Sequence, residues 1–297
     1  MKNKILEIIQ RNLSLLDDLS GYERYTLNRV LQCRCETVPF MVSRCDHCGK
    51  NHPVYQSCRN RMCPRCNGGK SIRWLAQREA ELLPTSYFLL TFTIPRELRV
   101  LFLYNKLLSY NLLFQAASRS LLQEIHKGFR SLQGEAGFFT MLHTWDQRLN
   151  FHPHLHVVIP SGCISPDRTR WNPSYQTFLL PVRRLSCLFR QKLLSALKKA
   201  AGQLILPPDW KLMDLMPLIN SLYQKDWVVH SKAPSKKSQN PRAMIRYLSR
   251  YVSKTPVQEE RILKVTEGRV HLKYMDRKKN LPKTEDISEQ LFLKRLV

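Results

Sequence analysis

Three histidines alternate with other residues in the segment 151–156 (FHPHLH), and an apolar run follows them. Successive side chains of a β-strand point to opposite faces, so His152, His154 and His156 are expected to project from the same face. A row of imidazoles makes a poor hydrophobic core, whereas imidazole is a common ligand of divalent ions. The spacing therefore predicts half of a metal site on one strand.

Seven of the nine cysteines lie between residues 33 and 66. Cys45 and Cys48 form one Cys-x-x-Cys pair, and Cys63 and Cys66 form another, with 14 residues between the pairs. Thiolates at this spacing converge on a tetrahedral zinc, and the gap resembles that of a zinc ribbon. We expect these four thiolates to bind one structural zinc and to leave no position for water. Further candidate ligands, for this or a second metal, are Cys33, Cys35, Cys58, His47 and His52.

Two tyrosines lie on an expected helix, 242–254, which begins after Pro241 and stops before Pro256. Tyr247 and Tyr251 are four residues apart, so they share one face of this helix. Phenols can attack a phosphodiester, and neighbouring cations can neutralise its oxygens. A tyrosine pair at this spacing is also common in ordinary packing, so its interpretation depends on the histidine strand. The cationic stripe beside the tyrosines comprises Arg242, Arg246, Arg250 and Lys254.

The charge of the chain indicates a polyanionic partner. Lys and Arg number 48 against 23 Asp and Glu, which gives a net charge of +25 over 297 residues. Nucleic acid is the first candidate, and the basic residues among the cysteines, including Arg59 and Arg61, predict a DNA-contacting lobe. No apolar run approaches the roughly 18–20 residues of a membrane-spanning helix, so we expect no membrane partner. Residues 1–20 predict an amphipathic helix and no export signal, hence a cytoplasmic location and reduced cysteines.

The pattern of the chain predicts the elements that hold these groups. Residues 1–80 are expected to form an N-terminal helix and a zinc-binding, DNA-contacting domain, and residues 81–297 a catalytic domain. Helical spacing ends at Pro84 and again near Gly128. The expected helices are 72–83, 98–127 and 185–201, and the expected strands are 87–94, 138–146, 152–159, 178–182, 226–231 and a hairpin of 261–265 with 269–274.

Together these motifs resemble the rolling-circle, two-tyrosine transposases of insertion sequences, which are members of the His-hydrophobic-His (HUH) endonuclease superfamily. The segments that carry the resemblance, in the same order, are 57–66 (SCRNRMCPRC), 88–93 (FLLTFT), 152–156 (HPHLH) and Tyr247-x-x-x-Tyr251. They cover most of the chain. The resemblance implies an α+β protein with a small cysteine-rich zinc-binding domain. A nuclease domain with a central antiparallel sheet flanked by helices would follow it.

The resemblance also implies a reaction. His154 and His156 would hold Mg²⁺ or Mn²⁺, with His152 as a third ligand and His143 or Asp146 as alternatives. The ion would polarise a phosphate of single-stranded DNA at the element ends. Attack by one tyrosine would leave a 5′-phosphotyrosine link and a free 3′-hydroxyl, which later rejoins the strands without a nucleotide cofactor. The second tyrosine would allow a second cleavage. The oligomeric state is left open.

Two departures from the family pattern bear on this expectation. Met62 and Met41 stand where relatives commonly have histidine, so the zinc shell must draw on Cys33, Cys35 or Cys58, or be lost. Relatives also continue beyond Val297 with a basic segment, so a C-terminally truncated copy is expected. A non-catalytic DNA-binding remnant and a rolling-circle plasmid replication initiator therefore remain as alternatives, and covalent capture of DNA would separate the remnant from an enzyme.

Overall fold

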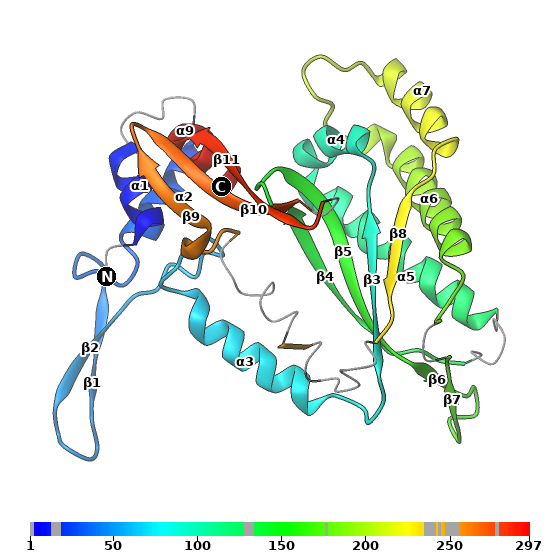
Figure 1. The fold of residues 1–297 in the computed structure, drawn as a ribbon, viewed down its shortest axis with the longest axis horizontal. Helices are drawn as coiled ribbons and strands as arrows, with labels where there is room; N and C mark the ends of the chain where they lie inside the picture. The colour runs from blue at the N-terminus through cyan, green and yellow to red at the C-terminus, as the bar shows by residue number, and fades with distance from the viewer. Residues whose placement is uncertain are drawn as a thin grey trace. The chain divides into compact units, whose positions relative to one another are not determined.

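The chain is described by a computed structural model for residues 3–12, 19–127, 134–175, 178–234, 242, 245–246, 256–276 and 279–297, with side chains left out for 67–71. These residues form two compact units (Figure 1). The first contains Met1–Ala80, Trp145–Asn150 and Arg246–Val297, and the second contains Glu81–Thr144 and Phe151–Ile245. The last fifty residues thus group with the N-terminal segment, whereas the expected domains were 1–80 and 81–297, and that division stays a prediction.

The first unit combines helices with two small antiparallel sheets, β1-β2 and β11-β10-β9. α2 begins at a capping box in which Ser20 and Glu23 satisfy each other's backbone amides. The expected hairpin of β9 and β10 is confirmed, and β11 extends it to three strands. The elements are α1 Lys4–Asn12, α2 Gly21–Leu31, β1 Phe40–Arg44, β2 Asn51–Tyr55, α3 Asn67–Ala80, η3 Glu259–Arg261, β9 Ile262–Thr266, β10 Arg269–Asp276, β11 Leu281–Ser288 and α9 Glu289–Leu296.

The core of the first unit explains why the two ends of the chain belong together. Ile5 of α1 and Leu27 of α2 are buried in one cluster with Phe292 of α9. Beside that cluster the buried carboxylate of Glu289 accepts a hydrogen bond from the Asn12 side chain. Burial of a charged group is costly unless it is hydrogen-bonded, so this contact joins α1 to α9 specifically.

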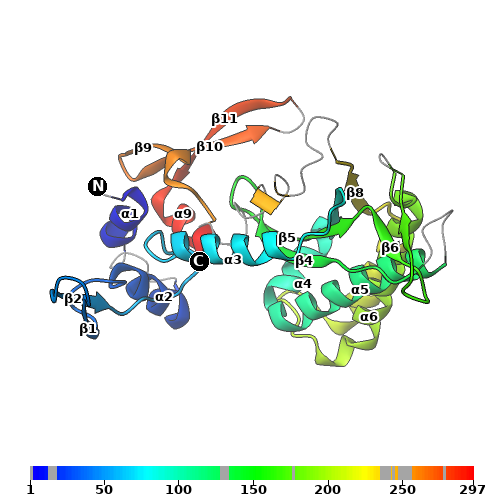
Figure 2. The same cartoon turned by 90° about the horizontal axis from the view of Figure 1, so that it is seen from below.

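The second unit is built on a four-stranded sheet of order β4-β5-β3-β8. Helices α4, α5 and α6 lie together on one side of this sheet (Figure 2). There the alternating apolar residues of β3 and β5, such as Phe92 and Leu155, are fully buried. The elements are β3 Tyr87–Thr93, η1 Arg96–Leu98, α4 Arg99–Tyr104, α5 Lys106–His126, β4 Phe139–Trp145, β5 Phe151–Pro160, β6 Gly162–Ile164, β7 Trp171–Pro173, α6 Val182–Lys199, η2 Ala201–Gln203, α7 Leu212–Tyr223 and β8 Val228–Lys232.

The expected fold class, α+β with a cysteine cluster and a central antiparallel sheet flanked by helices, is confirmed, and two expected elements are corrected. The helix expected at 98–127 is interrupted at Asn105, where the backbone leaves the helical conformation with φ −124° and ψ 41°. The side-chain amide of Asn105 donates to the carbonyls of Leu101 and Ile205 and accepts the Ile205 N–H. The strand expected at 178–182 is wrong, because Phe178 makes only an isolated bridge and α6 begins at Val182. Among the described residues, no helix is long and apolar enough to cross a membrane.

Candidate metal centres

One face of the sheet in the second unit gathers three histidines. His154 and His156 of β5 are half-buried, while Leu155 and Val157 between and beyond them are buried on the opposite face. His143 of β4 is buried beside them. One ring nitrogen from each of these histidines lies within 4.8 Å of the others, which is close enough for a shared metal ion. The predicted His154–His156 pair is therefore brought together with a partner from the neighbouring strand.

The third member of the group is His143. The resemblance implied His152 as the third ligand and His143 only as an alternative. The His143 ring centroid is 4.5 Å from that of His156 and 5.2 Å from that of His154. His152 contacts His154, with ring centroids 5.1 Å apart, but it does not join the group. Residues four apart on a strand are separated by about 13 Å, so one ion does not easily reach both His152 and His156. A cross-strand neighbour lies only about 5 Å away.

Asp146, the other alternative ligand, serves the turn between β4 and β5. Its Oδ1 accepts the backbone N–H groups of Arg148 and Asn150 at 2.8 and 3.0 Å. Its Oδ2 accepts the side-chain amide of Asn150 at 3.0 Å. Both carboxylate oxygens are thus committed to a local Asx-type turn, a common use of aspartate.

Hydrogen bonds and burial set the protonation of the histidine group. His154 Nδ1 is 2.7 Å from the backbone carbonyl of His152, which can only accept, so Nδ1 carries the proton and Nε2 keeps a lone pair. Burial, and then the charge of His154, lower the pKa of His143 to about 3. His143 is therefore neutral at physiological pH, which is the form that binds a metal.

The expected helix with the two tyrosines is only partly described. Tyr247, Tyr251, Arg250 and Lys254 lie outside the described residues. Within that segment, Arg242 is exposed in the second unit and Arg246 is exposed in the first, where it forms an ion pair with Glu79 at 3.1 Å. The assignment of the tyrosines therefore stays a prediction from the sequence.

A second group of ligands lies in the first unit. Its members are Cys33, Cys58, Cys63 and Cys66, with all four sulfurs within 4.8 Å of one another. The Sγ atoms of Cys33 and Cys66 are 3.3 Å apart, and those of Cys58 and Cys66 are 3.7 Å apart. Four sulfurs at about 2.3 Å from one zinc lie about 3.8 Å apart, whereas a disulfide needs about 2.05 Å. The geometry matches a closed tetrahedral zinc shell.

This group corrects the predicted pairing of the two Cys-x-x-Cys motifs. Cys45 and Cys48 follow β1 at the tip of the β1-β2 hairpin, which projects from the rest of the first unit (Figure 1). At the base of the hairpin, Gln56 N–H bonds Pro39 O and Arg34 N–H bonds Gln56 O. An antiparallel hairpin brings its flanking residues together and carries its tip away. Cys33 and Cys58 flank the hairpin, so they and not the tip pair meet Cys63 and Cys66.

The surroundings of Cys58, Cys63 and Cys66 give these three thiols different acidities. Burial raises the pKa of Cys58 to about 11, and burial together with neighbouring cysteines raises the pKa of Cys63 further. Burial also opposes ionisation of Cys66, but hydrogen bonds led by that from Ser57 outweigh it and lower its pKa to about 7. Ser57 Oγ lies 3.0 Å from Cys66 Sγ. Sequence reasoning missed this contact, whose only signal was the position of a serine next to a candidate ligand.

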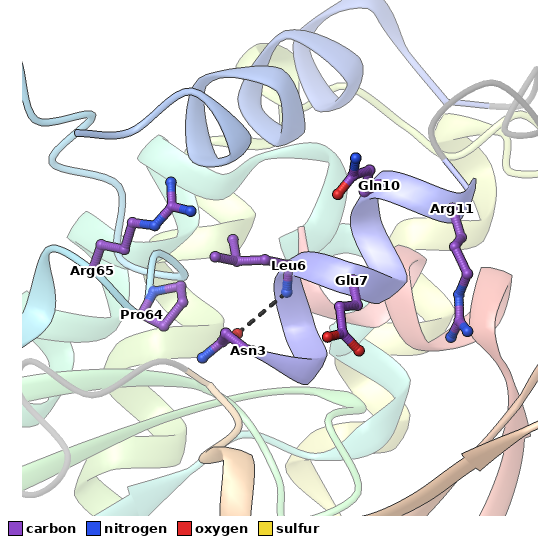
Figure 3. A pocket seen from close by; sticks show the side chains of 7 residues that line it. All are labelled: Asn3, Leu6, Glu7, Gln10, Arg11, Pro64 and Arg65. Atoms are coloured by element: carbon purple, nitrogen blue, oxygen red, sulfur yellow. Dashed lines mark hydrogen bonds between the residues drawn. The ribbon is translucent and has the colours of Figure 1, made fainter. Parts of the chain in front are cut away.

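The Arg65 side chain stabilises the backbone next to the cysteine group by hydrogen bonds. The Arg65 guanidinium donates to the carbonyls of Leu31 and Cys33 at 3.0 and 2.7 Å. Arg65 and Pro64 also line an open pocket of about 630 Å³ against α1 (Figure 3). Because its other lining side chains offer only one carboxylate, that of Glu7, and no histidine or cysteine, the pocket itself carries no evident chemistry.

The arginines expected to bind DNA near the cysteines are exposed. Arg59 follows Cys58 in a left-handed backbone conformation with φ 53°. The Arg61 guanidinium lies over the Trp145 ring, 5.3 Å from its centroid, which is a cation–π contact. Both positions leave the cationic groups accessible to a polyanion.

Comparison with known proteins identifies the chain. The family described as "Putative transposase" matches residues 137–297, and the "Transposase zinc-binding domain" of IS91 elements matches residues 3–94. A "Putative transposase y4qJ" from Sinorhizobium fredii is 36% identical over 286 residues, covering 94% of this chain and 71% of the relative. The "Transposase for insertion sequence element IS801" from Pseudomonas savastanoi pv. phaseolicola is 28% identical over 291 residues, covering 94% and 67%. No solved structure matches. The chain therefore belongs to the IS91/IS801 family of insertion-sequence transposases.

Proposed function

We propose that this transposase cleaves and rejoins single-stranded DNA at the ends of its element through a 5′-phosphotyrosine intermediate. The observation that carries the proposal is the group of His143, His154 and His156 on one face of the sheet. Three imidazoles on adjacent strands are suited to a divalent cation with open positions, and Mn²⁺ accepts imidazole more readily than Mg²⁺ does. When bound, such an ion would act as a Lewis acid toward the scissile phosphate.

The residues of the chain would carry the remaining steps. Tyr247 or Tyr251 would lose its phenol proton to solvent and attack phosphorus with the phenolate oxygen, so that a Tyr–O–P bond forms while the bond to the 3′-oxygen breaks. The 3′-oxygen leaves with a proton taken from solvent. The reverse attack by a 3′-hydroxyl would release the tyrosine and rejoin the strands. Cations of the 242–254 segment, such as Arg242, would neutralise the phosphate oxygens during both steps.

The zinc-binding domain has a structural role in this proposal. Cys33, Cys58, Cys63 and Cys66 would hold one Zn²⁺ with no open position, so the ion would fix the fold and not take part in cleavage. The exposed Arg59 and Arg61 beside it would contact DNA phosphates. Binding should therefore weaken steeply as the salt concentration rises, because counterions are released from the DNA.

Covalent capture tests the proposed chemistry. Purified protein is mixed with labelled single strands from both flanks of its coding locus and with Mn²⁺, and the products are separated on a denaturing gel. We expect an adduct that disappears with EDTA and in the double variant Tyr247→Phe, Tyr251→Phe. Tyr104→Phe, an exposed tyrosine of the second unit, is the matched control and should leave the adduct unchanged.

Variants at the histidines test the metal site in the same assay. His154→Ala with His156→Ala should abolish the adduct, and His126→Ala, at the exposed end of α5, should not. An adduct that persists in the tyrosine double variant would refute the nucleophile assignment. DNA binding without any adduct from strands that include the true ends would favour a non-catalytic DNA-binding remnant.

A further inference from the structure

The strand next to the histidines supplies one hydrogen bond to the metal group. Thr91 of β3 lies directly across from His156 of β5 in the antiparallel register. Its Oγ1 is 3.1 Å from Nδ1 of the His156 ring. On the same face, His154 makes the equivalent bond from its own Nδ1 to the carbonyl of His152 at 2.7 Å. Each of the two strand histidines therefore has its Nδ1 atom held by a protein oxygen.

The two bonds have the same consequence for a metal ion. A ring nitrogen that binds a metal carries no proton, so the other nitrogen of a neutral imidazole must carry it. The His152 carbonyl can only accept a hydrogen bond, so it fixes the proton of His154 on Nδ1 and leaves the lone pair of Nε2 for the ion. A hydroxyl can donate or accept, and it accepts here if His156 is to offer Nε2 to the ion that His154 binds. Such outer partners orient the ring and raise the basicity of the ligand nitrogen.

We propose that Thr91 is a positioning residue of the metal centre, which accepts the Nδ1–H of His156 and so presents its Nε2 to the ion. This inference rests on the proposed function only in assuming that the histidine group binds a divalent cation. Thr91 touches neither the ion nor DNA in this role. In the sequence it is the first of the two threonines of the FLLTFT segment, and nothing in the sequence indicates which histidine it contacts.

The same strand offers a matched control. Thr93 is two residues further along β3, on the same face and directly across from His154. The Nδ1 atom of His154 is already taken by a backbone carbonyl, and within the described residues no side-chain hydrogen bond of Thr93 is found. Both threonines are half-buried. Replacing either hydroxyl by a methyl group keeps a β-branched side chain suited to a central strand.

The first measurement reads the proton on His156 without metal. Full-length protein with ¹⁵N-labelled histidine is studied by NMR in EDTA, with the ring assigned through His156→Gln. We expect the proton on Nδ1 in the unmodified protein and in Thr93→Val. In Thr91→Val a larger share of the proton should move to Nε2. A His156 ring that already carries its proton on Nε2 in the unmodified protein would overturn the inference.

The second measurement is the affinity for Mn²⁺, followed by calorimetry. We expect Thr91→Val to bind Mn²⁺ about 10–100-fold more weakly, as for the loss of other outer-shell partners. Thr91→Ser keeps the hydroxyl and should restore most of the affinity, and Thr93→Val should bind like the unmodified protein. Equal affinity of Thr91→Val and the unmodified protein would refute the positioning role. If the unmodified protein binds no Mn²⁺, the proposed metal site fails, while the NMR result still decides the role of Thr91.

Discussion

Zinc loading of the cysteine cluster should release a number of protons that follows from the surroundings of its thiols. Zinc binds thiolates, so each ligand that is still protonated must lose a proton on binding. With a pKa of about 11, Cys58 is protonated at pH 7, and Cys63, whose pKa is raised further, is protonated as well. Cys66, with a pKa of about 7, is half-ionised. These three thiols alone should release about two to three protons per zinc at pH 7.

Isothermal titration calorimetry can count these protons. The apparent enthalpy of Zn²⁺ binding to the metal-free, full-length protein is measured in buffers with different ionisation enthalpies, and the slope gives the number released. Raising the pH from 7 to 8 should lower the count by about half a proton, because Cys66 is by then mostly ionised. Cys58→Ser should lower the count by about one.

Cys48→Ser is the control for this experiment. Cys48 is an exposed thiol at the tip of the β1-β2 hairpin, outside the group of four. It should therefore leave both the proton count and the affinity of the cluster unchanged. The reasoning would be refuted by a release of one proton or fewer at pH 7. It would also be refuted if Cys48→Ser abolished tight binding while Cys58→Ser did not.

Other perturbations give simpler readouts. In EDTA, the free energy of unfolding should fall as the pH is lowered from about 6.5 toward 3, because unfolded His143 takes up a proton that the folded protein excludes, at up to about 1.4 kcal/mol per pKa unit. His143→Phe should flatten this part of the curve measured by urea denaturation, and an unaltered slope would contradict it. Arg184→Ala should destabilise the protein by about 1–3 kcal/mol, because it leaves the buried Glu124 without its ion-pair partner. Arg168→Ala, whose partner Glu135 is exposed, should cost less than about 0.5 kcal/mol, and equal losses in thermal unfolding would contradict the comparison.

The strand that carries the histidines could be predicted because its pattern is local. Alternation of His154 and His156 with buried Leu155 fixes the period and the face, and β5 is found where it was expected. The third ligand depends on which residue lies across the sheet, and the sequence named His143 only as one alternative. Thr91 was beyond prediction for the same reason, since its contact depends on the register of β3 against β5.

The zinc pairing failed because spacing along the chain is not distance in space. Two Cys-x-x-Cys pairs with a ribbon-like gap suggest one shared metal, but part of that gap is β2, the returning strand of a hairpin. Cys33, 30 residues before Cys63, therefore joins Cys63 in one group, whereas Cys48, only 15 residues before it, does not. Recognising β1 and β2 as strands would have indicated that Cys33 and Cys58 meet at their base. Both strands are largely exposed, so they lack the alternation of apolar and polar residues that marks a half-buried strand.

The placement of Cys33 and Cys58 at the base of the β1-β2 hairpin makes that hairpin an exchangeable module. A bound zinc would join its two ends as a cross-link does, closing a loop whose closure entropy changes only slowly with loop length. Insertions into the hairpin, or a hairpin of different sequence, would leave the four sulfurs and the core beside them in place. The sequence of the hairpin is therefore free to differ between relatives. A chimaera that carries another transposase's hairpin should still fold around a zinc held by Cys33, Cys58, Cys63 and Cys66.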